Sequence, residues 1–128
     1  MTTNALQFTP ERVARRQRLI EICCAFPEAV ATGETHIKFT VRQKTFAYYL
    51  FDHHGDGRIA LHCKVPLGEQ QSFIESDPTR FAVPAYLGAK GWIAFWLDQK
   101  TLDWDTVAGL VRISYTLIAP KKLRLLME

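Results

Sequence analysis

The sequence predicts an α+β fold, a two-layer sandwich whose helices pack on one face of an antiparallel sheet. Apolar residues recur at helical spacing in residues 10–26 and 104–118. Between them, three short segments alternate apolar and polar residues and are joined by tight turns. The 128 residues, 48% of them apolar, suffice for one hydrophobic core. We therefore expect a single domain, residues 1–128, with the element order α-β-β-β-α-β-β-α.

The first helix has a recognisable start and end. Thr9 can cap it, Pro10 suits its first position, and an acidic residue follows in the first turn. The helix should end at Phe26, because the residue before Pro27 avoids the α region. Residues 1–8 are expected to form a flexible N-terminal tail.

Three strands follow the first helix and form an antiparallel meander. The first strand is expected at residues 35–41, the second at 46–51 and the third at 59–64. Residues 42–44 form a short polar turn. Residues 52–57 form the next turn and include an Asp-Gly pair, which permits positive φ angles.

The second half of the chain continues with a short helix, an edge strand, a central strand and a long helix, expected at residues 68–76, 81–86, 92–97 and 104–118. Pro84 suits an edge strand, because proline cannot donate to a sheet ladder. Pro120 marks the end of the last helix. Lys121 and Lys122 then begin a short basic tail.

The ends and the cysteines indicate a cytoplasmic protein without membrane contact. The N-terminus lacks the basic and apolar regions of a secretory signal. No apolar run approaches the roughly 20 residues that span a bilayer. Cys23, Cys24 and Cys63 are an odd number without framework spacing, so we interpret them as free buried thiols in a reducing compartment.

Seven short sequence features occur in order along the predicted elements. They are Pro27, His36-x-x-Phe39, Lys44-x-Phe46-Ala47, Leu61-His62-Cys63-Lys64, Tyr86, Gly91-Trp92-Ile93 and Ser114-Tyr115. With the element order, they resemble the MmcQ/YjbR-like family over about residues 10–122. Two positions differ from the family pattern: Ile37 stands where a proline often follows the histidine, and Gln43 where a glycine often precedes the lysine.

The resemblance implies a double-wing fold, also described as CyaY-like or secretion-chaperone-like. Members are commonly labelled DNA-binding because their two β-hairpins are likened to wings, which is an argument from analogy. The resemblance implies no catalytic residues. We interpret the motif residues as structural: His36, Phe39, Phe46, Trp92, Ser114 and Tyr115. We expect Ser114 and Tyr115 to pack the last helix on the sheet, where the Ser114 hydroxyl can bond back to the backbone.

Basic residues gather in three places, although the formal net charge is only +3. They are Arg12, Arg15 and Arg16 on one side of the first helix, Lys38, Arg42, Lys44 and Lys64 on or between the meander strands, and Lys121 and Lys122 in the tail. Such residues can contact phosphates, or they can form an ordinary solvated surface. If the sheet face opposite the helices is open, Tyr48 or Tyr49 would join it and suit base stacking.

Histidines, cysteine and aspartates between residues 52 and 63 have the ligand chemistry of zinc, but their spacing argues against a metal site. His53 and His54 are adjacent on a turn, whereas His62 and Cys63 point to opposite sides of one strand. The sequence has no glycine-rich phosphate loop, nucleophile elbow, H-E-x-x-H or C-x-x-C. We therefore expect no metal, no cofactor and no enzymatic activity.

The leading hypothesis is a small monomeric binding protein that contacts DNA non-specifically through its basic residues. The alternative is a protein- or peptide-binding module, which predicts an exposed apolar patch or a dimer. A small-molecule site is the least favoured hypothesis. It would need a pocket joining His36, Tyr86 and Trp92 and containing a titratable group with a strongly shifted pKa.

Overall fold

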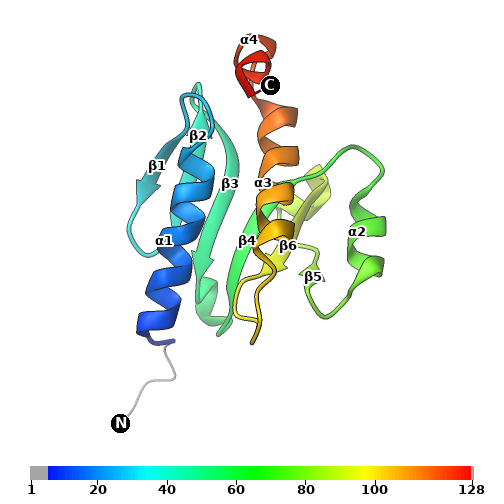
Figure 1. Ribbon diagram of the computed structural model, residues 1–128. Helices are drawn as coiled ribbons and strands as arrows, with labels where there is room; N and C mark the ends of the chain where they lie inside the picture. The colour runs from blue at the N-terminus through cyan, green and yellow to red at the C-terminus, as the bar shows by residue number, and fades with distance from the viewer. Residues whose placement is uncertain (1–5, 128) are drawn as a thin grey trace.

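The computed structural model describes residues 6–127, and within them it has one six-stranded antiparallel sheet. The strands are β1 (Val30–Gly33), β2 (Ile37–Val41), β3 (Lys44–Phe51), β4 (Ile59–Lys64), β5 (Phe81–Ala82) and β6 (Trp92–Trp96). The helices are α1 (Pro10–Cys24), α2 (Gln70–Ser76), α3 (Trp104–Ile118) and α4 (Lys121–Arg124). The sheet order is β1-β2-β3-β4-β6-β5, and α1 and α3 lie across one face of it (Figure 1). The α+β prediction is confirmed.

Two elements are additions to the predicted order. The strand β1 pairs with β2 from Val30↔Thr40 to Gly33↔Ile37 and forms one edge of the sheet. The expected basic tail instead begins with a further short helix, α4, whose Leu123 is only 3% exposed. Burial of this one apolar side chain holds the basic segment against the core.

The helix α1 begins as predicted. The Thr9 hydroxyl accepts a hydrogen bond from the Arg12 N–H at 3.2 Å, which satisfies one free donor of the first turn. The helix ends at Cys24, two residues before the expected position. Residues 1–5 of the expected tail lie outside the described residues, but Phe8 stacks on Phe51 with ring centroids 4.0 Å apart.

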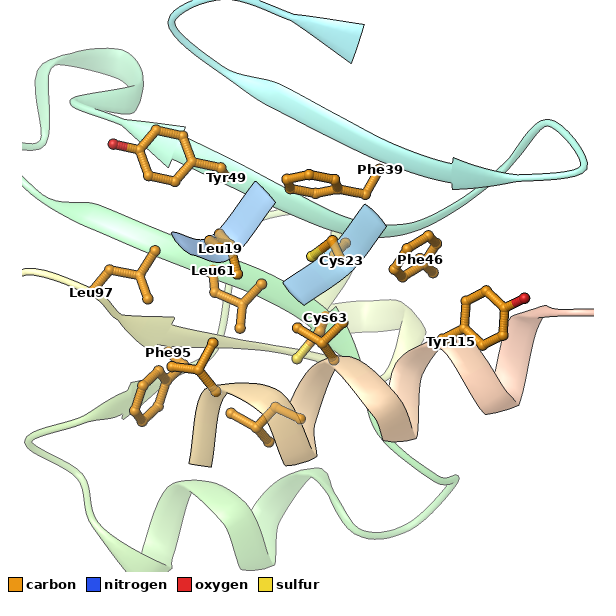
Figure 2. Close-up of a cluster of buried hydrophobic side chains, with 14 of the residues drawn as sticks. Leu19, Cys23, Phe39, Phe46, Tyr49, Leu61, Cys63, Phe95, Leu97 and Tyr115 are labelled. Carbon is orange, nitrogen blue, oxygen red and sulfur yellow. The ribbon is translucent and has the colours of Figure 1, made fainter. Parts of the chain in front are cut away.

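The core fills the space between the helices and the sheet. Figure 2 shows Leu19 and Cys23 of α1 in one cluster with Phe39, Tyr49 and Leu61 of the sheet. All five side chains are at most 1% exposed. Close packing of this kind explains why the sequence has large apolar residues at the positions that face inward, between the helices and the sheet.

The three thiols are free, but they do not share one environment. Cys23 and Cys63 are buried, whereas Cys24 is exposed, so the expectation of a buried thiol is wrong for Cys24. Burial raises the pKa of Cys63 to about 12 and that of Cys23 even further, which keeps both thiols protonated and unreactive.

Two polar side chains of α3 fasten it to the sheet side of the molecule. The Ser114 hydroxyl donates to the Phe46 carbonyl at 2.6 Å and accepts from the Lys64 N–H at 2.8 Å. It therefore bridges β3 and β4 through bonds to the backbone of the sheet. The Tyr115 hydroxyl donates to the Pro27 carbonyl at 2.7 Å.

The strand register separates the sheet into two faces. Facing the helices, one row runs through Ile37, Tyr49, Leu61, Phe95 and Phe81. On the opposite face, the neighbouring row runs through Lys38, Tyr48, His62, Ala94 and Ala82. Of the two tyrosines considered above, Tyr48 therefore belongs to the outer face and Tyr49 to the core. None of the helices in residues 6–127 is long and apolar enough to cross a bilayer.

Candidate functional site

The arginines of α1 bind backbone carbonyls of the protein itself. The Arg15 guanidinium donates to the carbonyl oxygens of Leu97 and Gln99 at 2.7 and 2.6 Å. Arg12 donates to the Gln7 carbonyl at 2.8 Å, and Arg16 to a carbonyl in the β1–β2 turn. These contacts fasten the loops beside α1 and occupy donors that a phosphate would otherwise use.

The remaining basic residues of the prediction lie in two other regions. Lys38 and Lys64 lie on the sheet face opposite the helices, as their register shows. Arg42 forms a bidentate ion pair with Glu28, with the closest atoms 2.6 Å apart. Lys44, Lys121 and Lys122 are exposed. The nine predicted residues are therefore spread over both sides of the sheet and do not form one contiguous face.

A concavity of about 450 Å³ lies on the sheet face opposite the helices. Its floor is formed by alternate residues of four neighbouring strands: Tyr48 and Leu50 of β3, Ala60 and His62 of β4, Ala94 and Trp96 of β6, and Ala82 of β5. We call this concavity, with its two walls described below, the open-face hollow. Most of its surface is apolar, and its floor is built on strands rather than on loops, so its shape is fixed by the sheet.

The first wall is the loop of residues 83–87. Its centre, Tyr86, has φ 63° and ψ −61°, and the Leu87 N–H donates to the Ala85 carbonyl at 2.7 Å. These features define a γ-turn of the rare, strained kind. The turn leaves the Tyr86 side chain 88% exposed at the edge of the hollow. Strained backbone of this kind is often retained where the residue serves a binding site.

The second wall is the turn between β3 and β4. It contributes His53, His54 and Asp56 to the hollow. Asp52 holds this turn, because its carboxylate accepts from the Gly57 N–H at 2.8 Å while its own N–H donates to the Arg58 carbonyl at 2.8 Å. The wall is therefore polar, in contrast to the apolar loop of residues 83–87.

The imidazole of His62 is the polar group on the floor. Within residues 6–127 it forms no hydrogen bond with the protein. Burial lowers the pKa of His62 to about 4, with a smaller contribution from His53, while Asp56 opposes the shift. At neutral pH the hollow thus contains an uncharged imidazole that can both donate and accept a hydrogen bond.

Three of the four histidines of the chain, His53, His54 and His62, line the hollow, and the fourth, His36, contacts His53. The ring of His53 lies 3.9 Å from that of His54 and 5.2 Å from that of His36, measured between centroids. Burial, aided by the neighbouring imidazoles, lowers the pKa of His53. The described residues nevertheless contain no group of three histidines, cysteines or carboxylates placed to hold a metal ion.

An arginine fixes the ring of Trp96 on the floor. The Arg58 guanidinium lies 3.8 Å from the centroid of the Trp96 ring. Two hydrogen bonds to the Asp98 carboxylate, at 2.8 and 3.0 Å, hold the guanidinium in this position. Trp96 is therefore held in place independently of any ligand.

The hollow matches only in part the pocket that the small-molecule hypothesis required from the sequence. Tyr86 lines it, as expected for a small-molecule site. Trp92 is 6% exposed and supports Tyr48, with ring centroids 5.9 Å apart. His36 does not line the hollow; its Nδ1 accepts from the Phe51 N–H at 3.1 Å. The small residues at alternate strand positions were a signal for this site, because an outer sheet face exposed only to water does not require them.

Two other concavities are less suited to a ligand. One of about 70 Å³ beside α1 is the size of a few water molecules; Glu11 and Arg12 line it, and so does Tyr49, whose buried hydroxyl has no partner among residues 6–127. The other is a shallow groove of about 620 Å³ between the end of α1, the middle of α3 and the C-terminal turn. None of the residues within 6–127 that line it offers a buried polar group to orient a ligand.

Comparisons with known proteins identify a family and a solved structure with a similar fold. The YjbR family model matches residues 24–117, which include every residue of the open-face hollow. The crystal structure of Deinococcus radiodurans protein DR2400, which has a DUF419 domain, is similar with a TM-score of 0.69 and 21% sequence identity. The similarity covers 88% of this chain and 86% of that one and supports the fold. No curated protein matches the chain.

Proposed function

The chain belongs to the YjbR family, and we propose that it is a binding protein that holds a small molecule in the open-face hollow. The observation that carries this proposal is the hollow itself. Its volume of about 450 Å³ lies within the range of roughly 300–1,000 Å³ typical of ligand sites. Its mostly apolar lining and few convergent polar groups are also typical of such sites.

The prediction that the protein is not an enzyme is kept as part of this proposal. No serine, threonine, cysteine or lysine is among the described residues that line the hollow. Its titratable groups are Tyr48, Tyr86, three histidines and Asp56. These groups are suited to hydrogen bonding with a ligand.

Fluorescence of the uncharged apolar dye N-phenyl-1-naphthylamine would test the proposal. Ala94→Leu and Ala82→Leu each place a larger side chain on the floor, so each should weaken dye binding at least tenfold. Ala14→Leu is the matched control, because it makes the same change on exposed α1, on the other side of the sheet. Absence of dye binding in the wild type, or equal binding in all four proteins, would contradict the proposal.

The protein- or peptide-binding alternative concerns the same hollow. Val83 is 57% exposed and Tyr86 88% exposed at its edge, which adds apolar surface for a partner. If short apolar peptides displace the dye and small aromatic compounds do not, the peptide-binding alternative replaces the small-molecule proposal.

Non-specific DNA binding is the second candidate, and one observation favours it. The β2–β3 turn, with Arg42 and Lys44 at its ends, and α4 lie at the same end of the molecule (Figure 1). Lys122 is close enough to Glu28, the ion-pair partner of Arg42, to contribute to the lowered pKa of that carboxyl, after the larger effect of Arg42. With Lys121, these residues make this end basic.

Fluorescence anisotropy with a labelled duplex at low salt would test DNA binding. A Lys121→Ala/Lys122→Ala double variant should bind several-fold more weakly, and the affinity should fall steeply with salt. The matched control is Lys90→Ala/Lys100→Ala, which removes the same charge elsewhere. No binding, or binding that ignores salt and both variants, would exclude this candidate.

A further inference from the structure

The shape and polarity of the open-face hollow restrict what it can hold. We infer that its ligand is an uncharged, flat ring compound with a hydrogen-bonding group at one end. This inference rests on the proposed function, because it names the class of molecule that would occupy the same site.

The floor is shaped for a flat molecule. The register places Ala60 opposite Trp96 and Ala94 opposite His62, so small side chains lie in the middle of the sheet with larger ones beside them. Ala60 and Ala94 are 4% and 2% exposed, so they lie at the bottom of the hollow. A ring can lie over these methyl groups, while larger side chains there would exclude it.

The aromatic side chains of the floor are held in place before a ligand arrives. Tyr48 contacts the ring of Trp92, and Trp96 lies against the guanidinium of Arg58. A ring compound that packs between them therefore orders few additional side chains, which favours its binding. Aromatic rings also gain from offset or edge contacts with one another.

The imidazoles and the carboxylate of the hollow lie near one another, because His53 and Asp56 both affect the pKa of His62. His53, His54 and Asp56 come from the turn after β3, whereas the loop of residues 83–87 contributes mainly apolar side chains. His62 lies on the floor without a hydrogen-bond partner among the described residues. A ligand that covers His62 must pair with it, because a covered polar group without a partner weakens binding. The ligand therefore needs a polar group where it covers His62.

A net charge on the ligand is disfavoured in both signs. An anion would lie near the Asp56 carboxylate and would face imidazoles that burial keeps uncharged. A cation over Trp96 would be repelled by the Arg58 guanidinium, which already lies 3.8 Å from the centroid of that ring. Removing either charge from water would also cost desolvation free energy, which contacts with the apolar floor do not offset.

Four compounds with the same ring system test this inference at pH 7.5. They are 2-naphthol, 2-methylnaphthalene, 2-naphthoate and 2-naphthylmethylammonium, titrated into the full-length protein by NMR. We expect 2-naphthol to bind roughly fivefold more tightly than 2-methylnaphthalene, as one hydrogen bond provides. Both charged compounds should bind at least tenfold more weakly than 2-naphthol.

The His62→Leu variant separates a ligand contact from a general effect of the apolar surface. It should lose the preference for 2-naphthol but should still bind 2-methylnaphthalene. If a charged compound binds as tightly as 2-naphthol, or if His62→Leu keeps the preference, this inference is wrong while the proposed function stands. If none of the four compounds binds at the hollow, both are wrong.

Discussion

The Ser114 side chain affects both faces of the sheet, because it fixes α3 on one face and the strands that form the hollow on the other. Its hydroxyl joins α3 to the Phe46 carbonyl and to the Lys64 N–H, and it is completely buried. These two bonds fix the helix over the junction of β3 and β4, the two strands that also carry Tyr48 and His62 on the outer face. The position of the hollow thus depends on a contact on the opposite side of the sheet.

Replacing Ser114 by alanine should therefore destabilise the fold. The change removes two hydrogen bonds and leaves their backbone partners without this contact, so we expect a loss of about 2–3 kcal/mol in the free energy of unfolding. Urea unfolding monitored by circular dichroism would measure it. The control is Ser76→Ala, because the Ser76 hydroxyl bonds to its own helix and is exposed. A Ser114→Ala loss no larger than that of the control would contradict the assigned role.

His62 links stability to pH. Its pKa is about 4 in the folded protein and near 6.5 when solvated, so the unfolded chain takes up the proton first as the pH falls. The His62 contribution to stability is therefore complete above about pH 6.5 and falls between pH 6.5 and 4. The slope from this one residue is at most about 1.4 kcal/mol per pH unit.

The His62→Leu variant isolates this effect. Its free energy of unfolding should fall less than that of the wild type when the pH is lowered from 7 to 5, by about 1–2 kcal/mol. Urea titrations at the two pH values would measure the difference. An equal fall in both proteins would show that His62 is not buried as described.

At the scale of elements, the β2–β3 turn departs from its most favourable sequence. Arg42 and Gln43 have φ angles of 49° and 68°, which are typical of a two-residue type I′ hairpin turn. The second position favours glycine because side chains rarely adopt such an angle. This is the position at which the family pattern often has glycine and this chain has glutamine.

Gln43→Gly should therefore stabilise the hairpin. We expect the free energy of unfolding to rise by about 0.5–1 kcal/mol, since the strain at a positive φ is removed. Gln43→Ala is the control, because it shortens the side chain but keeps the Cβ. Thermal unfolding of the three proteins would decide the point. A gain that appears equally in Gln43→Ala would contradict the assignment of strain to this angle.

The elements that the sequence predicts well are those in which apolar residues recur at a regular helical or strand spacing. The helix α3 was expected at residues 104–118 and is found there, and β4 matches its expected bounds. The strand β1 was missed because all four of its residues are exposed, so it has no burial pattern, and pairing with β2 holds it. The helix α4 was missed because a single buried leucine holds it in place. The basic residues around that leucine indicated a charged tail instead.

The open-face hollow could be predicted only in part for a related reason. Alternation shows that Tyr48 and Tyr49 point to opposite faces of their strand, but neither which of them faces outward nor whether a loop covers that face. The wall formed by residues 83–87 depends on the turn at Tyr86, which has a φ of 63°. Because tyrosine rarely adopts a positive φ, its residue type does not predict this turn. Tyr86 itself was singled out, whereas the alanines of the floor were not.

At the scale of the whole molecule, the placement of charge separates the two candidate functions. The three arginines at the start of α1 bind backbone carbonyls, and Lys38 and Lys64 lie on the other face of the sheet. The net charge of +3 therefore does not gather over one broad surface. This distribution favours a small ligand over an extended polyanion, which needs several phosphate contacts at once.

The open face of the sheet is thus the part of the molecule from which function should be sought. It combines a fixed strand floor, aromatic rings held by Trp92 and Arg58, and the His62 imidazole, which has no hydrogen-bond partner within residues 6–127. The opposite face is occupied by the helices and the core (Figures 1 and 2). One family-matched segment, residues 24–117, contains the entire site.

The most direct test is a ¹H–¹⁵N NMR titration of the wild type and Ala94→Leu with 2-naphthol. The account predicts saturable shifts confined to β3, β4, β6 and the loop of residues 83–87, and their loss in Ala94→Leu. Saturable shifts over α1 and α3 instead, or the same shifts in both proteins, would contradict the assignment of the open-face hollow as the binding site.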